Sequence, residues 1–252
     1  MKRIGWFTTA RGPGSYGLFK TMMDAIRDGE IDAQISFVFI NREVKDNEYR
    51  RKLIEMAEQN DVPVIIFPSD TFRPDLKEKD MEAWRDAYGE GLRDRIAPYP
   101  MDLGVLAGYM LIVDPETCRR HVLINLHPAL PDTYKGTWKE IVTKVAESPD
   151  RCYGATVHVC SPVLDCGTPI AFDSFSIDDL RENVPKERLA EAIRAREVER
   201  EVPLLIEALK LLVSEQINIR DGDLFDRHGQ RLNEPANLSA RISAVVEGSR
   251  QR

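Results

Sequence analysis

An amide, an imidazole and a carboxylate stand in this chain where they could catalyse an acyl transfer. Asn125 and His127 follow a mostly apolar run at residues 121–124, and Asp165 comes about 40 residues later. The amide can donate a hydrogen bond to a developing oxyanion, and the imidazole can take a proton from an attacking amine. The carboxylate can orient and charge-stabilise that imidazole. This chemistry requires no nucleophilic Ser or Cys.

The elements that must position these residues alternate between strand and helix. Strand patterns occupy four early segments, at residues 3–8, 35–40, 62–67 and 101–106. Helix patterns stand between them, at residues 18–26, 48–60 and 81–96. This alternation predicts an α/β fold with a Rossmann-like, mostly parallel sheet and helices on both faces.

Later segments predict a different arrangement of strands. Residues 122–125 add a buried strand, and residues 153–160 and 169–177 indicate an antiparallel pair joined through the Asp165 loop. A small hairpin, then a helix or a loose tail, is expected near the C-terminus. Because ligands of open α/β sheets bind beyond the carboxyl ends of the strands, Asn125 and Asp165 can converge there.

The composition agrees with an enzyme that acts on small molecules. The 252 residues allow one or two domains with a real core, and we expect a catalytic domain over residues 1–213 with a C-terminal hairpin and tail over residues 214–252. A net charge of -7 argues against binding nucleic acid by general electrostatics. No stretch approaches the roughly 20 apolar residues that span a membrane, and Met1 leads directly into a strand rather than a signal peptide. We therefore expect a cytoplasmic protein with no membrane partner.

Three segments resemble the folate-dependent formyltransferases, and most of all the phosphoribosylglycinamide formyltransferases. The sequence reads Leu-Ala-Gly-Tyr-Met at residues 106–110, Ile-Asn-Leu-His-Pro at residues 124–128 and Leu-Asp-Cys-Gly at residues 164–167. The likeness runs in one order from the first strand to Asp226. It implies the formyltransferase fold, with three catalytic residues: Asn125, His127 and Asp165.

A lone histidine beside apolar residues is more often a core residue than a catalyst. For His127, catalysis is favoured by Asn125 two residues earlier and by the following Pro128. Asp165 also stands where the family leads us to expect it. His158 alternates along an expected strand, where it either supports the Asp165 loop or only packs, and we favour the supporting role.

The resemblance also implies a co-substrate, 10-formyltetrahydrofolate, and the residues that bind it. These residues are Leu106, Ala107, Gly108, Tyr109, Met110, Val163 and Leu164. An ordinary buried strand and turn is the alternative for the first five. Leu111 stands where the glycinamide enzymes often have a basic residue, so contacts to the benzoyl-glutamate tail are expected to differ.

Residues 12–17 have the spacing G-x-G-x-x-G between an expected strand and an expected helix. Alone, this spacing suggests a dinucleotide site, but the acidic Glu43 comes too late after the second strand to hold a ribose. The resemblance implies instead that backbone N–H groups of Gly14, Ser15 and Tyr16 bind a substrate phosphate at the helix N-terminus. A turn that needs glycines only for their positive φ is the alternative.

The charged stretch at residues 187–201 predicts a helix whose charges lie mostly on a solvated face with i, i+4 pairs. The resemblance implies that a basic residue and a glutamate of this helix contact the substrate. Arg194 and Glu199 fit these roles if the register shifts by one residue.

Four side chains able to bind a metal fall in a short span, at Cys152, His158, Cys160 and Cys166. The C-x-x-C pairs of structural zinc sites are missing. We therefore expect no metal. The 4 cysteines of the chain are also few for a disulfide scaffold of this size.

The main hypothesis is formyl transfer from 10-formyltetrahydrofolate to a primary amine. A phosphorylated small molecule, 5-phosphoribosylglycinamide, is the favoured acceptor, and purine biosynthesis is the implied pathway. An amino-sugar formyltransferase or a formyltetrahydrofolate hydrolase could use the same three residues. Such hydrolases usually carry an extra N-terminal domain, which we do not expect because the first strand follows Met1 directly. A methionyl-tRNA formyltransferase is disfavoured because no separate basic domain is visible.

A second hypothesis, from a different class, is a non-catalytic homologue that binds folate. It is kept open by Pro13, which removes a backbone donor, by Tyr16, where the family usually has Asn, and by Leu111. The intact catalytic residues argue against it. A homodimer is also left open, and residues 70–98 have no assigned role.

Overall fold

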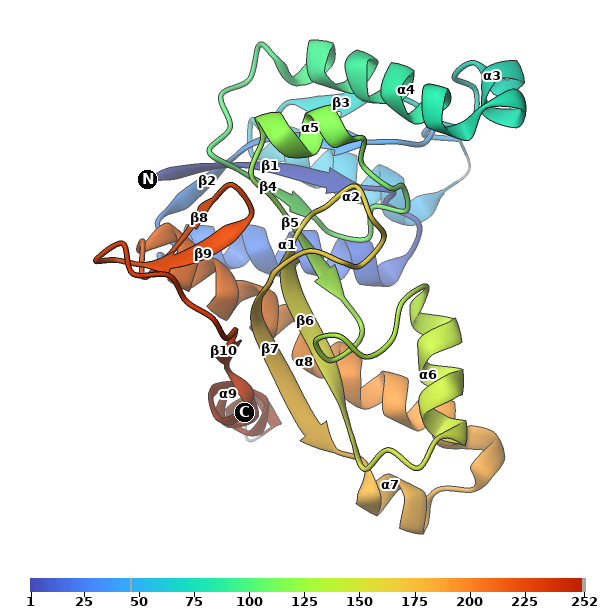
Figure 1. The fold of residues 1–252 in the computed structure, drawn as a ribbon, viewed down its shortest axis with the longest axis vertical. Coiled ribbons are helices and arrows are strands. Elements are labelled where there is room, and N and C mark those ends of the chain that lie inside the picture. Colours follow the sequence, from blue (N-terminus) through green and yellow to red (C-terminus); the bar gives the residue numbers. More distant parts are fainter. Residues whose placement is uncertain (46, 251–252) are drawn as a thin grey trace. The chain divides into compact units, whose positions relative to one another are not determined.

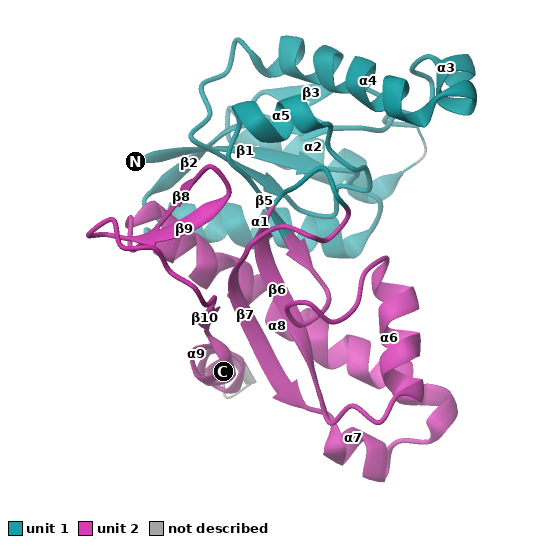
Figure 2. Ribbon diagram, in the orientation of Figure 1, with its two compact units in different colours: residues 1–125, 160–163 teal, residues 126–159, 164–252 magenta. Residues whose placement is uncertain are grey.

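The structure is a computed structural model of the chain, and it describes residues 1–45 and 47–250. The chain divides into two compact units, coloured separately in Figure 2. Unit 1 comprises residues 1–125 and 160–163, and unit 2 comprises residues 126–159 and 164–252. Each unit is described by itself below.

Unit 1 is built on parallel strands. They are β1 (Lys2–Thr8), β2 (Ala33–Ile40), β3 (Val64–Ile66), β4 (Leu103–Leu106) and the first residues of β5 (Leu123–His127). Their order is β5-β4-β1-β2-β3, and every pair runs parallel. All four residues of β4 are buried, as expected for a strand covered on both faces. The prediction of a parallel sheet is confirmed here.

Helices of unit 1 form two groups. They are α1 (Pro13–Arg27), α2 (Glu48–Gln59), α3 (Pro74–Lys79), α4 (Met81–Ile96) and α5 (Pro115–Arg120). α1 packs against α2, and α4 packs against α3 and α5. Figure 1 shows the two groups on opposite faces of the strands. The predicted helix over residues 81–96 is confirmed with the same bounds.

Aromatic side chains dominate the core between α4 and the strands. The buried members of this aromatic cluster are Phe7, Phe37, Phe39, Phe67, Trp84, Tyr88 and Tyr109. Tyr88 stacks on Phe67 with ring centroids 4.5 Å apart and on Trp84 with centroids 5.2 Å apart. Such rings bury a large apolar area with few rotatable bonds, so they hold α4 firmly to the strands.

Unit 2 contains the antiparallel strands. β6 (Cys152–Val159) pairs antiparallel with β7 (Pro169–Ser176), and β10 (Ala236–Asn237) runs parallel to β7. β8 (Ile217–Arg220) and β9 (Asp223–Asp226) form a separate hairpin. Together with unit 1 this confirms the predicted fold class, which places antiparallel strands late in a mostly parallel α/β chain.

The helices of unit 2 are α6 (Trp138–Glu147), α7 (Asp178–Asn183), α8 (Lys186–Val213) and α9 (Ser239–Arg250). α8 packs on α6, β6 and β7, and α9 packs on α8 and β7. A bidentate ion pair joins α8 to β7, because Arg200 donates from Nε and Nη2 to the two carboxylate oxygens of Asp173, both at 2.6 Å. Both side chains are buried.

Residues 12–17 differ from their prediction as a glycine-rich loop. α1 begins at Pro13, with Gly12 as its N-cap at φ -157°, so most of the segment is the first turn of a helix. Pro is well suited to this position because its missing N–H would have no helical partner. None of the three glycines at 12, 14 and 17 has a positive φ, so the alternative of a turn that needs them for that reason is wrong.

Across the described part of the chain, no helix combines the length and the apolar character needed to cross a membrane.

Candidate active site

His127 ends β5, and both of its ring nitrogens face oxygen atoms. Nδ1 lies 3.4 Å from Oδ1 of Asp165, and Nε2 lies 2.8 Å from the carbonyl oxygen of Tyr134. The side chains of His127 and Asp165 are each only 8% exposed. A carbonyl oxygen can only accept a hydrogen bond, so Nε2 is the donor in its contact with Tyr134. The predicted imidazole–carboxylate pair is therefore present within unit 2.

The Asp165 loop is held in an uncommon backbone conformation. Asp165 has φ 50°, in the left-handed region, and its Oδ2 accepts a hydrogen bond from the N–H of Gly136 at 3.1 Å. Gly136 itself has φ 114°, which a residue with a Cβ adopts only with strain. Non-glycine residues at such angles cluster at functional sites. The carboxylate is thus fixed from two sides, by its own turn and by the Gly136 N–H.

β5 carries Asn125 and His127 two residues apart. Because side chains alternate along a strand, the two point to the same face of β5. Asn125 is partly exposed, as a hydrogen-bond donor for a substrate must be. β6 supports the turn that follows, since Tyr153 Oη donates to the carbonyl of Pro128 at 2.5 Å and Thr156 Oγ1 donates to that of Ala129 at 2.7 Å.

His158 lies beside His127. Its ring centroid is 6.0 Å from that of His127, and its Nδ1 is 2.9 Å from the carbonyl oxygen of Val159. Burial lowers the pKa of His158, which favours the neutral ring. A Cβ added to Gly167 would lie 1.5 Å from that same carbonyl oxygen and 2.9 Å from Nδ1 of His158. Only glycine fits at 167, and its lack of a Cβ lets the Asp165 loop pack closely against the end of β6.

In unit 1, the segment predicted to bind the formyl donor is tied to the end of β1 by Thr9. The N–H of Thr9 donates to the carbonyl of Gly108 at 3.0 Å, and its Oγ1 accepts from the N–H of Met110 at 2.9 Å. Gly108 has φ 66°, and a Cβ there would lie 2.9 Å from Ser15 Oγ. The structure therefore brings Gly108 and Ser15 together, one predicted for the donor and the other for the acceptor.

The predicted donor-binding residues differ in exposure. Leu106, Ala107 and Tyr109 are buried, whereas Met110 is 55% exposed, Val163 61% and Leu164 47%. These three side chains therefore present apolar surface to solvent. Met110 and Val163 belong to unit 1 and Leu164 to unit 2.

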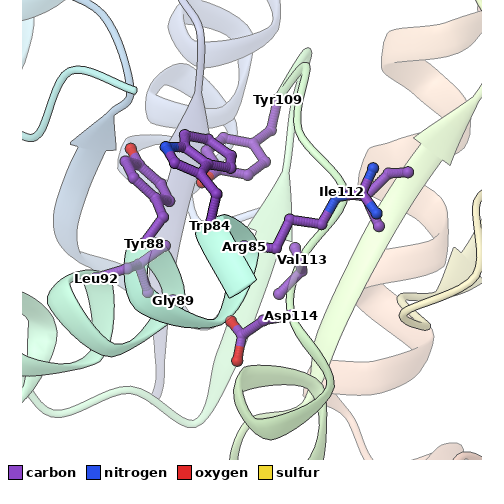
Figure 3. A pocket seen from close by; sticks show the side chains of 9 residues that line it. All are labelled: Trp84, Arg85, Tyr88, Gly89, Leu92, Tyr109, Ile112, Val113 and Asp114. Carbon is purple, nitrogen blue, oxygen red and sulfur yellow. The ribbon is translucent and has the colours of Figure 1, made fainter. Parts of the chain in front are cut away.

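A pocket lies behind the donor segment, within unit 1. Figure 3 shows Tyr109 and Val113 on one side of it and Trp84 and Tyr88 of α4 on the other. Burial raises the pKa of Tyr109, and the neighbouring Tyr88 raises it further. Tyr109 thus anchors the donor segment to the aromatic cluster.

The first turn of α1 presents fewer backbone donors than predicted. The N–H of Tyr16 donates to the carbonyl of Gly12 at 3.3 Å inside the helix, and Pro13 has no N–H. The N–H groups of Gly14 and Ser15 remain at the open end of the helix, because the residues four positions before them lie outside it and supply no helical acceptor. Of the three N–H groups predicted to bind a phosphate, those of Gly14 and Ser15 are left for this role, and that of Tyr16 is used inside the helix.

The charged helix α8 also differs from its prediction. Glu199 is exposed, whereas Glu197 and Arg200 are buried, so part of the expected solvated face is core. Arg194 pairs with Glu197 at 2.8 Å and with Glu201 at 2.7 Å. Its guanidinium lies 5.0 Å from the ring centroid of Trp138. Burial, and then the charge of Glu201, raise the pKa of Glu197 to about 8 against the opposing effect of Arg194.

Three residues that contact the catalytic pair or its loop were not singled out from the sequence. Tyr134 accepts from His127, Gly136 donates to Asp165, and Lys135 Nζ lies 2.6 Å from Sγ of Cys166. The only sequence signal for this loop is Gly136, which follows a run of turn-forming residues. Among the residues that the structure describes, no three His, Cys, Asp or Glu side chains gather closely enough to hold a metal ion.

Comparison with known proteins adds a family to this geometry. The formyl transferase family model matches residues 12–209. Phosphoribosylglycinamide formyltransferase of Haemophilus influenzae is 27% identical over 225 residues, which are 88% of this chain and 92% of the relative. The enzyme of the same name from Schizosaccharomyces pombe is 30% identical over 166 residues, 62% of this chain and 76% of the relative.

Solved structures show the same fold. Phosphoribosylglycinamide formyltransferase of Coxiella burnetii superposes with a TM-score of 0.74 at 22% identity, covering 94% of this chain and 98% of that one. A formyltetrahydrofolate deformylase of Pseudomonas syringae superposes with a TM-score of 0.66 at 20% identity, covering 89% and 65%. Because the family model spans most of its length, this chain belongs to the formyl transferase family.

Proposed function

We propose that this enzyme transfers the formyl group of 10-formyltetrahydrofolate to the amine of 5-phosphoribosylglycinamide, a reaction of purine biosynthesis. The observation that carries the proposal is the buried pair of His127 and Asp165 at the end of β5, on the strand that also bears Asn125. These are the groups that amine formylation needs. The names of the relatives supply the acceptor.

In this reaction, the acceptor nitrogen attacks the formyl carbon and the carbonyl oxygen becomes an oxyanion. Asn125 donates a hydrogen bond to that oxygen, an interaction that is stronger in the transition state than in the ground state. His127 takes the proton that the attacking nitrogen must lose, and Asp165 stabilises the imidazolium so formed. The folate nitrogen that departs receives a proton as the tetrahedral intermediate collapses. His158 supports the Asp165 loop through Gly167.

The donor site is assigned to the segment that follows β4. Leu106, Ala107 and Tyr109 form its buried base, and Gly108 leaves room for the close approach of Ser15. Exposed Met110 and Val163, both in unit 1, offer apolar surface to a flat pterin ring. Leu164 remains a predicted donor contact. Leu111 provides no charge for the glutamate tail of the folate.

The acceptor site is assigned to the first turn of α1, where Gly14 and Ser15 offer N–H groups to a phosphate. Tyr16 contributes its side chain rather than its N–H, since that N–H is used inside the helix. Glu199 remains the predicted acceptor contact on α8, and Arg194 is already held by Glu197 and Glu201. A cytoplasmic location, a homodimer and a boundary near residue 213 also remain predictions.

A second candidate function is hydrolysis of the formyl donor, favoured by the fold likeness to a formyltetrahydrofolate deformylase. Water would then replace the amine, and the same imidazole would accept its proton. The two functions differ in whether donor turnover requires an acceptor. Amino sugars are a further class of acceptor that the same catalytic residues could serve.

The test is turnover of 10-formyltetrahydrofolate by the purified protein, followed by absorbance. The assay is run with 5-phosphoribosylglycinamide, with a panel of amino sugars and with no acceptor. We expect turnover that depends on 5-phosphoribosylglycinamide and that falls by at least about 100-fold in His127→Asn. His228→Asn, in the exposed β8–β9 hairpin region, is the matched control and should retain full activity.

Turnover without an acceptor would establish the hydrolase instead. Folate binding with no turnover on any acceptor would favour the non-catalytic homologue. No folate binding at all would refute the transferase, the hydrolase and the non-catalytic homologue alike.

A further inference from the structure

The turn between β1 and α1 is built by side chains from α2, a helix that the catalytic argument does not use. The turn spans Thr8 to Gly12, and Ala10 within it has φ 49°, an unfavourable angle for a residue with a Cβ. Its N–H donates to Oγ1 of Thr8 at 3.0 Å. One local hydrogen bond does not compensate a left-handed alanine, so this shape requires support from elsewhere in unit 1.

The first turn of α2 supplies that support. Asn47 caps α2 by accepting from the N–H of Arg50 at 2.8 Å, and its Nδ2 donates to the carbonyl of Arg11 at 2.9 Å. Arg50 Nη2 donates to the carbonyl of Thr9 at 3.1 Å, and its Nη1 donates to the carbonyl of Glu43. Two carbonyl oxygens of the turn, which would repel an anion, are thereby bound by donors.

Arg50 also brings positive charge close to the turn. The residue is 7% exposed, and burial together with the charge of Arg42 lowers its pKa, against an opposing effect of Asp70. Among the described residues, 1–45 and 47–250, no carboxylate forms an ion pair with Arg50, and the hydrogen bonds of its guanidinium go to the two carbonyls. A guanidinium stays protonated in proteins, so Arg50 contributes positive potential beside the turn.

Buried polar atoms beside the turn lack partners in the described chain. Nε of Arg50 and both side-chain polar atoms of Asn41 are buried without a hydrogen bond. Asn41 adjoins the turn, since its N–H donates to the carbonyl of Thr8 at 3.3 Å. Such atoms carry a desolvation cost that a bound ligand or water can offset. They are a second sign, independent of the open N-terminus of α1, that this part of unit 1 receives a polar ligand.

We propose that Arg50 and Asn47 are positioning residues for the phosphate of the acceptor. They hold the Thr8–Gly12 turn so that the N–H groups of Gly14 and Ser15 are presented to an anion, and Arg50 adds fixed positive charge behind them. The inference rests on the proposed function and deepens it. The substrate class that it selects is a phosphate monoester of a sugar amine, in preference to an unphosphorylated amine.

The test measures phosphate binding directly, with ribose 5-phosphate as the probe, by calorimetry on the full chain. Arg50→Met is compared with Arg51→Met, an exposed neighbour on the same helix that serves as the matched control. We expect the Kd of the probe to rise about tenfold in Arg50→Met, because the variant loses both the fixed positive charge and the donor that holds the turn, and to stay unchanged in Arg51→Met. Asn47→Asp retains an oxygen to cap α2 but loses the donor to Arg11, so its Kd should rise as well.

Kinetics separate positioning from general loss of structure. In Arg50→Met, KM for the phosphorylated acceptor should rise about tenfold, while kcat and KM for 10-formyltetrahydrofolate stay near the wild-type values. Arg50→Lys keeps the charge without the planar fork and should restore part of the affinity. A variant that merely folds poorly would lose donor affinity and kcat together.

Three results would overturn the inference: wild-type protein that does not bind ribose 5-phosphate, equal losses in Arg50→Met and Arg51→Met, or a rise in donor KM as large as that in acceptor KM. Binding of the probe that is lost in Arg50→Met, in a protein that formylates no amine, would support the phosphate site while refuting the proposed activity.

Discussion

The two units of this enzyme are stabilised by different kinds of side chain. Behind the donor segment, unit 1 is held mainly by stacked aromatic rings, with Phe67, Tyr88 and Trp84 at the centre. Unit 2, which holds the pair of His127 and Asp165, contains ion pairs that reach into its core, such as Arg200 with Asp173 and Arg194 with Glu197. The contrast is one of degree, since unit 1 also contains a buried pair between Arg93 and Asp114.

This difference suggests that the two units respond differently to pH and to the loss of charged side chains. A pterin is flat and largely uncharged. A segment anchored by aromatic rings should keep its shape at both pH 5 and pH 8.5, because the rings do not change charge there. The residues that we propose for catalysis must exchange protons, and unit 2 contains buried titratable side chains. Unit 2 should therefore respond to lost charges and to pH more strongly than unit 1, and the following predictions test that comparison.

The largest effect is expected from Asp173→Ala. Removing this carboxylate leaves Arg200 buried without its bidentate partner, and breaking such a pair typically costs about 3–5 kcal/mol. The free energy of unfolding is measured by urea denaturation. Asp179→Ala is the control, because it breaks the pair between Arg196, on the same helix, and a carboxylate that is 59% exposed. Its cost should stay below about 1 kcal/mol, and equal losses in the two variants would remove the basis of the comparison.

An intermediate effect is expected from the proton on Glu197. The pKa of this carboxyl rises from 4.5 to about 8, mainly through burial. Between those values the folded chain holds a proton that the unfolded chain has released, so stability falls as pH rises through this window and is fully retained below it. The change should be about 4 kcal/mol between pH 5 and pH 8.5, measured by urea denaturation at those two pH values.

Glu197→Gln should flatten this dependence, since the amide does not titrate. Glu199→Gln, an exposed neighbour, is the control and should leave the slope as it is in the wild type. A slope that persists in Glu197→Gln would assign it to another group.

The smallest effect is expected in unit 1, from Tyr88→Phe. The change keeps the aromatic ring and removes only the hydroxyl that donates to the carbonyl of Phe67 at 2.5 Å. The loss should be about 1 kcal/mol, the net contribution of one hydrogen bond, and should be equal at pH 5 and pH 8.5. Differential scanning calorimetry at the two pH values checks this, and a loss that varied with pH would contradict a charge-independent unit 1.

The strands of unit 1 and the helix α4 were predictable from the local sequence pattern. The strands of unit 1 are short apolar segments bounded by turn residues, and α4 has the helical period over residues 81–96, so its bounds required no knowledge of tertiary contacts. The strand signals at residues 153–160 and 169–177 likewise correspond to β6 and β7. The resemblance in three short motifs led to the family because those motifs concentrate residues that act in chemistry.

The features that local sequence pattern could not reveal are contacts between residues distant in sequence. The charges of α8 were predicted to face solvent, but Arg200 is buried because Asp173 lies 27 residues earlier on β7. The same holds for Tyr134 and Gly136, whose contacts with His127 and Asp165 involve backbone atoms that any residue type would supply. The start of α1 was missed because Gly and Pro favour loops on average, whereas Pro at the first helical position favours a helix.

The division of the chain into units has a consequence for how Asn125, His127 and Asp165 are connected along the chain. The chain passes from one unit to the other after Asn125, after Val159 and after Val163, and His127 and Asp165 each come two residues beyond such a crossing. Two peptide links limit the Cα separation of Asn125 and His127 to about 7 Å, whatever the rest of the fold does. An insertion of one residue at Leu126 would turn His127 to the opposite face of the strand from Asn125. The alignment of these two side chains therefore depends on the number of residues between them on a single strand.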